Sequence, residues 1–461
     1  MNTPETTRSA RARVVAWLYR HRWLLAITVA ALVLRLHWNL MVHPLGDYVV
    51  SDMRGYDVRS TQLLTNPWKK IEYHGFFPYG AHYVVAAVKW LFGRYNYPAI
   101  SVAYALMGTI TVSLAYLIAA RVSRHAWVPP LLGLILIPYY PIISLGGYML
   151  SETPFAVFLM AATYSLVCLA QDGKARQAWL AGLWVGCATA VRPQVMISVA
   201  LFGLLWLVAR KRMPKIRLAH LVMMAAPLAA ILAFSSYRLH HHTGRRGLVS
   251  ENGTFNLAFG RCHARKIMST PKGEYKSHIM FGPPPLIQLE HRAERNPNSW
   301  VQLGAALGPE LEFPGFISDK QALNGFIKQC VEKTGWLGQL KYSVINVMLL
   351  SAYNTAWPDS GQGLWRKLAT SWGKANLYAF TFPALLGMIL AFRRRELDRL
   401  ALVAIHPLGL MILAFIVFGG ARLRASYDPL IILLALEGYA FLALGGYGLV
   451  RKLMARRGAR S

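Results

Sequence analysis

The chain has 461 residues, of which 55% are hydrophobic and 15% are charged. A soluble protein would carry about a quarter charged residues. The hydrophobic residues form runs of roughly 17 to 25, the length that crosses about 30 Å of hydrocarbon. The net charge of +30 would suggest nucleic-acid binding in a soluble protein. Here Arg and Lys instead gather in short loops between apolar runs, as the positive-inside rule describes. Composition therefore predicts a membrane protein and argues against nucleic acid as a partner.

The apolar runs predict an all-α polytopic membrane protein with about 10 transmembrane helices (10–12). Two further apolar stretches, 79–93 and 338–356, are expected to stay on the outer side as juxtamembrane or re-entrant helices. If either crossed, the basic loops that follow would change sides. The ten expected spans lie near 23–42, 97–120, 127–148, 153–170, 177–193, 194–210, 217–237, 375–392, 398–419 and 427–451.

The basic loops orient the chain, and all of them fall on one side if 79–93 does not cross. This places both termini in the cytoplasm and the protein in the inner (plasma) membrane as a multi-pass protein. The basic stretch from Arg8 to Arg22 lacks a small-residue cleavage site, so we expect it to lead into the first span. The other cytoplasmic cations are Arg121, Arg124, Lys174, Arg176, Arg210, Lys211, Arg212, Lys215, Arg217, Arg393, Arg394, Arg395, Arg399 and the tail 451–460.

Three segments are then expected outside: 43–97, the turn 144–152, and 238–374. We divide the chain into a transmembrane catalytic module at 1–237 that includes the first outer loop, an extracytoplasmic cap domain at 238–374, and C-terminal transmembrane helices at 375–461. Cys262 and Cys330 both fall in the exported segment, where the redox environment permits a disulfide. The sequence leaves open whether their Cα atoms are close enough to form one.

The first outer loop contains Asp47, Asp52 and Asp57 within eleven residues, although the whole chain has only 20 acidic residues. A lone loop acid is usually just solvated, but this cluster directly follows a membrane span and alternates with aromatic residues. A carboxylate placed there can act as a general base that takes the proton of an attacking hydroxyl. We select Asp52 as the candidate catalytic base.

One reaction that would use such a base is the transfer of a sugar from a polyprenyl phosphate to a hydroxyl. The sugar is activated because phosphate is a good leaving group, and cations must hold that phosphate as negative charge develops. Charges at span ends often only extend toward the lipid headgroups. Arginines on the outer side, however, run against the positive-inside bias and so suggest a role. The candidate phosphate-binding cations are Arg54, Lys69, Lys70, Arg192, Arg422 and Arg424.

Two other features allow more than one reading. Glu152 opens the span 153–170, where it either complements the helix dipole or faces the same cavity as Asp52. The triplet from His240 to His242 has no carboxylate at ligand spacing, so a metal site is not favoured. The sequence requires no cofactor, and it remains compatible with a divalent metal.

Several motifs follow one another in an order that resembles a known family. Asp52 is followed by Tyr56, and a proline-led helix that starts after Pro78 ends at Gly93. The remaining motifs are Ser151-Glu152-Thr153-Pro154, Ala190-Val191-Arg192-Pro193, the segment from Ser250 to Gly260 that contains Asn252, and the turn from Arg422 to Pro429. Together they resemble the GT-C class of membrane glycosyltransferases, in the branch of protein O-mannosyltransferases and lipid A aminoarabinose transferases.

The resemblance implies that Asp52 is the base, that the donor is a polyprenyl-phosphate sugar in the outer leaflet, and that the anomeric carbon is inverted. It implies that Tyr56 and Glu152 shape the acceptor pocket, and that Asn252 lies in a substrate-binding segment. The family's paired Asp-Glu is Asp52-Met53 here. This departure leaves open whether Asp57 or Glu152 supports the base.

Two alternatives to a glycosyltransferase stay open from the residues alone. One is a transporter or flippase of a lipid-linked sugar or anionic lipid, which would favour internal repeats or charges at mid-membrane. The other is a non-catalytic partner in envelope assembly. The expected partners of an enzyme are the lipid bilayer, the polyprenyl-phosphate donor, and an acceptor that is a lipid, a polysaccharide or a protein. The sequence names neither the sugar nor the acceptor.

Overall fold

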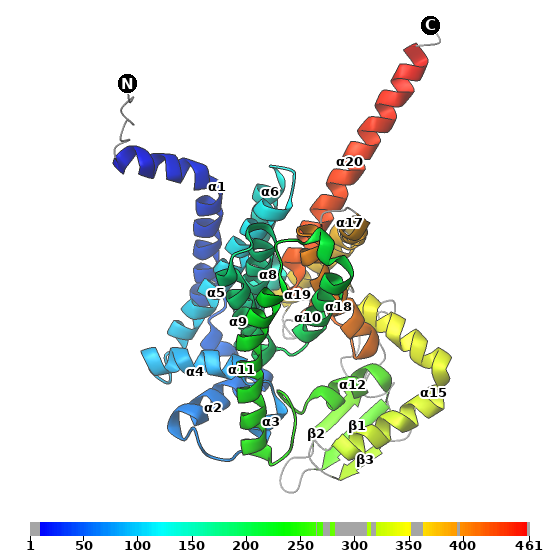
Figure 1. The fold of residues 1–461 in the computed structure, drawn as a ribbon. Helices are drawn as coiled ribbons and strands as arrows, with labels where there is room; N and C mark the ends of the chain where they lie inside the picture. Colours follow the sequence, from blue (N-terminus) through cyan, green and yellow to red (C-terminus); the bar gives the residue numbers. More distant parts are fainter. Residues whose placement is uncertain are drawn as a thin grey trace.

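The structure is a computed structural model, and it describes residues 10–263, 265–270, 277–281, 311–314, 320–351, 363–393 and 397–458. Long helices run side by side to form a bundle, and shorter helices and a small sheet lie at one end of it (Figure 1). The bundle helices are α1 (Ala10–His37), α5 (Tyr97–Val122), α8 (Glu152–Asp172), α9 (Ala175–Val191), α10 (Val195–Ala209), α11 (Leu218–Thr243), α16 (Gly363–Ala375), α17 (Phe382–Arg393), α18 (Leu400–Ile416) and α20 (Asp428–Gly458).

Every one of the ten expected spans coincides with helix, so the prediction of an all-helical membrane region is confirmed. Within the described residues, five helices are long and apolar enough to cross a membrane, or six if one bent pair counts as a span. Helices α9, α10 and α18 have 17, 15 and 17 residues, which corresponds to about 22–26 Å of rise. The count of ten spans therefore stays a prediction.

The bent pair consists of α6 (Val128–Leu136) and α7 (Tyr140–Gly146), which meet at 49°. A break inside an apolar bundle leaves carbonyl oxygens without helical partners. Arg35 of α1 is 3% exposed, and its guanidinium donates to the carbonyls of Leu136, at 3.1 Å, and Ile137, at 3.5 Å. Arg35 therefore supplies hydrogen-bond donors to the carbonyls that the break between α6 and α7 leaves exposed.

Helix α8 is the most buried of the candidate spans and packs between α5 and α9. Its first residue, Glu152, lies at the same end of the bundle as the short helices η2 (Leu45–Tyr48), α2 (Ser51–Thr65), α3 (Tyr73–Phe76) and α4 (Gly80–Phe92). This end of α8 therefore brings a buried acid next to the first outer loop.

Helix α4 covers the run 79–93 that was expected not to cross the membrane. Its 13 residues rise about 20 Å, which is less than the roughly 30 Å of hydrocarbon. It lies across the ends of α5 and α9 rather than along them (Figure 1). A Cβ on Gly80 would lie 2.6 Å from Val191 Cγ2, so the glycine permits α4 to begin against the end of α9. The length and direction of α4 agree with a helix at the membrane boundary.

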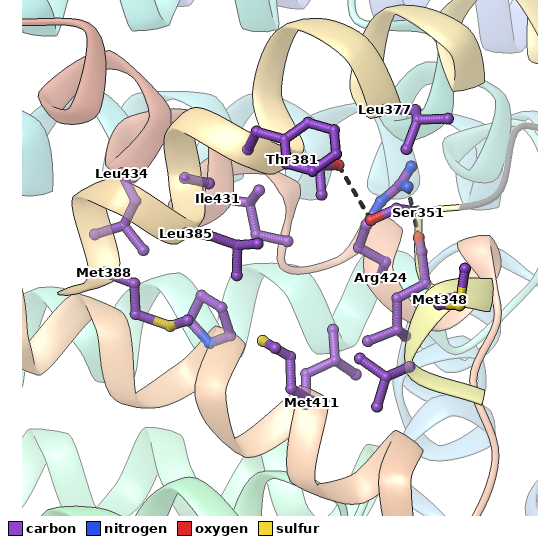
Figure 2. Close-up of a pocket in the computed structure, with 16 residues that line it drawn as sticks. Met348, Ser351, Leu377, Thr381, Leu385, Met388, Met411, Arg424, Ile431 and Leu434 are labelled. Carbon is purple, nitrogen blue, oxygen red and sulfur yellow. Dashed lines mark hydrogen bonds between the residues drawn. The ribbon is translucent and has the colours of Figure 1, made fainter. Parts of the chain in front are cut away.

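A largely apolar cavity of about 410 Å³ lies between α15 (Lys320–Leu349), α17, α18 and α20. Figure 2 shows Met348, Leu385, Met388, Met411 and other apolar side chains around it, with Arg424 at one side. Arg424 belongs to the short helix α19 (Ala421–Ala425), and its guanidinium contacts Asp428 at 2.8 Å and the Leu350 carbonyl at 2.6 Å.

The outer segment contains α12 (Gly253–Arg261), α15, and a three-stranded sheet of β1 (Arg265–Thr270), β2 (Ser277–Phe281) and β3 (Leu311–Pro314). The strand order is β2-β1-β3, with β1 antiparallel to β2 and parallel to β3. The sequence did not predict these strands, so the all-α prediction needs this small correction. The strands lie inside the predicted 238–374 cap, although α11 continues to Thr243 and α16 starts at Gly363.

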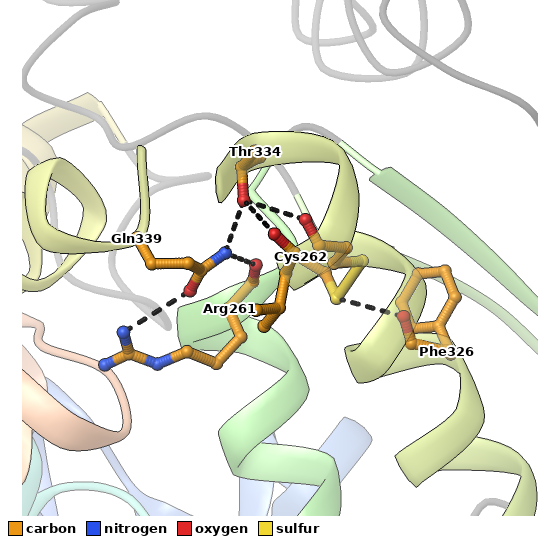
Figure 3. Close-up of a disulfide and its surroundings, with 7 residues drawn as sticks. Arg261, Cys262, Phe326, Thr334 and Gln339 are labelled. Atoms are coloured by element: carbon orange, nitrogen blue, oxygen red, sulfur yellow. Dashed lines mark hydrogen bonds between the residues drawn. A yellow bond between two sulfur atoms is a disulfide. The ribbon is translucent and has the colours of Figure 1, made fainter. Parts of the chain in front are cut away.

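A disulfide between Cys262 and Cys330 joins the end of α12 to α15, with the two Cα atoms 5.3 Å apart (Figure 3). Arg261, the neighbour of Cys262, donates to Gln339 and Ser343 of α15 and to the Ile416 carbonyl at the end of α18. A Cβ on Gly260 would overlap the Val417 carbonyl, so only glycine fits where α12 meets this end of α18. The cap is therefore fastened to the membrane bundle through α12.

We expect Cys330→Ser to lower the free energy of unfolding by about 2–4 kcal/mol, because the closed loop no longer restricts the unfolded chain. Thermal unfolding of the purified protein in detergent, with and without reductant, measures the change. Cys187→Ser is the matched control, since Cys187 is a free cysteine in α9. Reaction of Cys262 with maleimide in the unreduced wild type would contradict the disulfide.

Candidate functional site

Asp52 and Tyr56 lie one turn apart on α2. Val50 is extended before the helix, and Asp52 falls in the first turn, where the exposed N–H groups favour a negative charge. The spacing of four residues puts Tyr56 on the same face as Asp52. Both side chains line one cavity; that of Asp52 is 40% exposed, whereas Tyr56 is buried. Burial is the main reason that the pKa of Tyr56 is raised, so the phenol stays protonated at neutral pH.

Glu152 lies at the centre of the ionic contacts. Its side chain is 1% exposed, and its Oε1 is 2.7 Å from Nη2 of Arg192 and in contact with Nε of Arg422. Nη1 of Arg422 also lies 3.3 Å from Oδ2 of Asp52. Arg422 therefore bridges the two carboxylates, which come from helices 100 residues apart in the sequence.

The arrangement is held in place by further hydrogen bonds. Arg192 Nε donates to Ser151 Oγ at 3.0 Å, and Ser426 Oγ donates to the Glu152 carbonyl at 3.1 Å. Burial lowers the pKa of Arg422, but Glu152 and Asp52 raise it by more, so the net shift is upward. Arg422 is thus a permanent cation whose position is fixed by two acids.

These side chains border a cavity of about 720 Å³ that is lined by the first turns of α2, the ends of α9 and α18, and Leu232 within α11. The volume is within the range of small-molecule sites. Its wall contains both polar and apolar side chains. The polar or charged lining residues are Asp52, Tyr56, Ser151, Thr189, Arg192, Gln194, Ser250, Asn252, Asn256, Lys320 and Arg422. The apolar lining residues include Phe77, Pro78, Met196, Leu232, Leu248, Leu413, Val417, Phe418 and Leu423.

The structure brings together most of the sequence-predicted site. Asp52, Tyr56, Arg192, Asn252 and Arg422 line the cavity, and Glu152 reaches it through its two arginines. Glu152 is the acid of the first turn of α8 and is also linked through Arg422 to Asp52, so both readings of Glu152 fit its position.

Four predicted substrate-binding residues lie elsewhere. Arg54 and Lys69 are exposed and do not line the cavity. Asp57 Oδ1 is 2.7 Å from Nζ of Lys89, and the Lys89 side chain is buried, so this acid fastens α4 to α2. Arg424 faces the apolar cavity and pairs with Asp428.

The sequence reasoning missed several lining residues. Ser151 and Gln194 each adjoin a predicted residue and were within reach of the motif argument. Lys320 and Asn256 come from the long outer segment, which shows no periodicity that would place them. In the described part of the chain, no group of three or more His, Cys, Asp or Glu side chains could hold a metal ion. The compatibility with a divalent metal stays an expectation.

The fold and the cavity define a polytopic membrane protein with opposed carboxylates and guanidiniums at one end of its helix bundle. Residues 53–236 match the model of the family described as dolichyl-phosphate-mannose-protein mannosyltransferase. The resemblance to this GT-C family is thereby confirmed over that part of the chain, which contains Tyr56, Glu152 and Arg192. The match supports membrane glycosyl transfer as the activity. A comparison with curated proteins found no match to this chain.

Two solved structures similar to this chain are crystal structures of ArnT from Cupriavidus metallidurans. One is bound to undecaprenyl phosphate; it is 15% identical, with 92% of this chain and 79% of that chain covered and a TM-score of 0.39. The other is in the apo state, 15% identical, with 91% and 78% covered and a TM-score of 0.36. Similarity at this level carries no argument about the site.

Glu152→Gln should lower the free energy of unfolding by about 3–5 kcal/mol, because it leaves two guanidiniums without their buried acid. Chemical or thermal unfolding in detergent measures this. The control is Glu72→Gln, which removes a pair with Arg245 whose Glu72 side chain is 55% exposed; here we expect about 1 kcal/mol or less. Equal effects in the two variants would show that Glu152 does not organise the site.

Proposed function

We propose that this protein transfers a sugar from a polyprenyl-phosphate donor to an acceptor hydroxyl on the extracytoplasmic side of the membrane. The observation that carries the proposal is the meeting of Asp52, Arg422 and Arg192 at one cavity. A carboxylate that can take a proton and cations that can hold a phosphate are the two requirements of this chemistry. The family description, which names a polyprenyl-phosphate sugar, supports the donor class.

In the proposed reaction the acceptor O–H gives its proton to the Asp52 carboxylate, and the acceptor oxygen forms a bond to the anomeric carbon. The bond from that carbon to the phosphate oxygen breaks, and the polyprenyl phosphate leaves with the electron pair. Attack from the face opposite the leaving group inverts the anomeric configuration. The partly exposed Asp52 side chain can reach an acceptor in the cavity.

The arginines have a defined part in this reaction. Arg192 and Arg422 stand on the cavity wall, and each has one side engaged by Glu152. The phosphate gains negative charge as it leaves, and guanidiniums fixed beforehand stabilise that charge without having to reorganise. The acid Glu152 is thus a positioning residue, which keeps both cations at the wall in the absence of donor.

The sidedness of the proposal rests on the basic loops and on the disulfide. Helix α11 runs from the loop 210–217, which is rich in Lys and Arg, to the end of the bundle where α2, α3 and α4 lie (Figure 1), and α2 contributes Asp52 and Tyr56 to the cavity. The Cys262–Cys330 bond lies at the cavity end, and disulfides persist in oxidising compartments. We therefore place the cavity outside the cytoplasm, both termini inside, and the protein in the inner membrane.

Asp52→Asn is expected to reduce sugar transfer by at least about 100-fold, because the amide cannot accept the proton. The measurement is transfer from a polyprenyl-phosphate sugar in reconstituted membranes. Asp47→Asn is the matched control, since Asp47 is an exposed acid five residues away, and it should retain activity. Unchanged transfer in Asp52→Asn would overturn the catalytic assignment. A wild type inactive with every donor would favour transport or scaffolding instead.

Cysteines introduced at Arg94 and Lys211, which are both exposed, should react from opposite sides of the membrane. A membrane-impermeant maleimide added to intact cells is expected to label Arg94→Cys and not Lys211→Cys. Labelling of Lys211→Cys and not Arg94→Cys would mean that α4 crosses the bilayer. Labelling of both would mean that an even number of spans lies between the two positions. Either result would make the predicted sidedness wrong.

A further inference from the structure

A group of basic side chains that the proposed reaction does not use lies where α2, α3, α4 and α11 meet. We call Arg59, His74, His82, Arg238 and His242 the buried basic cluster. Arg59 is 2% exposed, His82 1%, Arg238 3% and His74 4%. His242 is partly buried, and its ring centroid lies 5.1 Å from that of His74. This is an unusual concentration of basic groups for the interior of a protein.

Aromatic rings surround the two guanidiniums. Arg59 Cζ lies 4.4 Å from the ring centroid of Phe77 and 4.9 Å from that of Tyr56. Arg238 Cζ lies 5.0 Å from the centroid of Tyr79. Such contacts stabilise a cation. Arg59 also forms a hydrogen bond with Tyr73, and Arg238 forms one with Tyr83, but these bonds do not satisfy all the N–H groups of the two guanidiniums.

The polar atoms of the cluster are incompletely paired. Arg238 Nη2 donates to the His74 carbonyl at 2.5 Å, and His74 Nε2 contacts Gln62 Oε1 at 2.7 Å. Nε and Nη1 of Arg59, Nε and Nη1 of Arg238, and both ring nitrogens of His82 are buried and have no hydrogen-bond partner. Each such group costs free energy unless something accepts from it.

No carboxylate among the described residues lies within ion-pair distance of either guanidinium. Asp52 affects the pKa of Arg59 only by electrostatic interaction at longer range. His82 lies in the field of both arginines. Burial first, and then Arg238 and Arg59, hold its pKa well below the usual value, so the ring is neutral near pH 7. Burial and its basic neighbours likewise lower the pKa of His74 to about 3. Near pH 7 the positive charge of the cluster therefore comes from the two guanidiniums.

We propose that the buried basic cluster binds one small inorganic oxyanion of the phosphate class, held between Arg59 and Arg238 with a ring N–H of His82 as a further donor. Two guanidiniums match the charge of a dianion, and charge-assisted hydrogen bonds to an oxyanion are the strong kind.

This anion site is distinct from the proposed donor site. Tyr56 and Phe77 line the catalytic cavity and also stack on Arg59, so the two rings form a wall between the cavity and the cluster. The anion would join α2, α4 and α11 in the way that a structural ion does. It would therefore fix the helix that carries Asp52.

The test is equilibrium binding of radiolabelled inorganic phosphate to the full chain in detergent, together with the melting temperature at increasing phosphate. We expect about one phosphate per chain and a rising melting temperature, since a ligand that binds only the folded state stabilises it. Arg59→Gln and Arg238→Gln should both abolish the binding and the thermal shift. Arg94→Gln, which changes an exposed arginine, should retain both. Chloride at equal ionic strength should not substitute for phosphate.

Further variants separate this site from the catalytic cavity. Arg422→Gln should lose sugar transfer but retain phosphate binding. If Arg422→Gln loses phosphate binding while Arg59→Gln and Arg238→Gln retain it, the anion lies in the cavity and the proposal is overturned. If either cluster arginine is needed for folding, His82→Phe keeps the ring shape and should weaken phosphate binding about tenfold. A wild type that binds no phosphate, or one stabilised by anionic lipid vesicles but not by inorganic phosphate, would also overturn it.

Discussion

The ionic contact between Glu152 and two arginines is the constraint on which the cavity end of the bundle depends. A carboxylate that is 1% exposed can stay ionised only if cations replace its water. Arg192, at the end of α9, and Arg422, in α19, do this. Arg422 also reaches Asp52 on α2. One buried acid thereby sets the relative positions of three separate chain segments around the cavity.

The same logic governs the other charges that lie inside this molecule. Lys89 is buried against Asp57 and Thr61, and Arg424 against Asp428. Arg35 has carbonyl oxygens at the break between α6 and α7 as its acceptors. In each case a buried polar group is matched by a local partner, as an apolar environment requires. The buried basic cluster departs from this rule, and that departure is the reason to look for a ligand there.

Much of this architecture could be predicted from the sequence. The lengths of the apolar runs located the bundle helices. The scarcity of acids and arginines on the expected outer side singled out Asp52, Glu152, Arg192 and Arg422. Pairing between distant positions could not be predicted: Asp57 and Lys89 are 32 positions apart, and nothing in the spacing joins them. Arg424 and Asp428 are only four positions apart, so this pair could have been read from the sequence. Without their partners, Asp57 and Arg424 looked like substrate ligands. The strands of the outer segment were missed because no clean alternation marks them.

The position of Arg422 along the chain has a consequence for biogenesis. Glu152 and Arg192 emerge from the ribosome early, whereas Arg422 follows Glu152 by 270 residues. Until then the buried acid has only one of its two cations, and one wall of the cavity is missing. The end of α18 and the disulfide-bonded cap are also made late. Chains truncated before α19 therefore cannot assemble the cavity, however well their earlier helices insert.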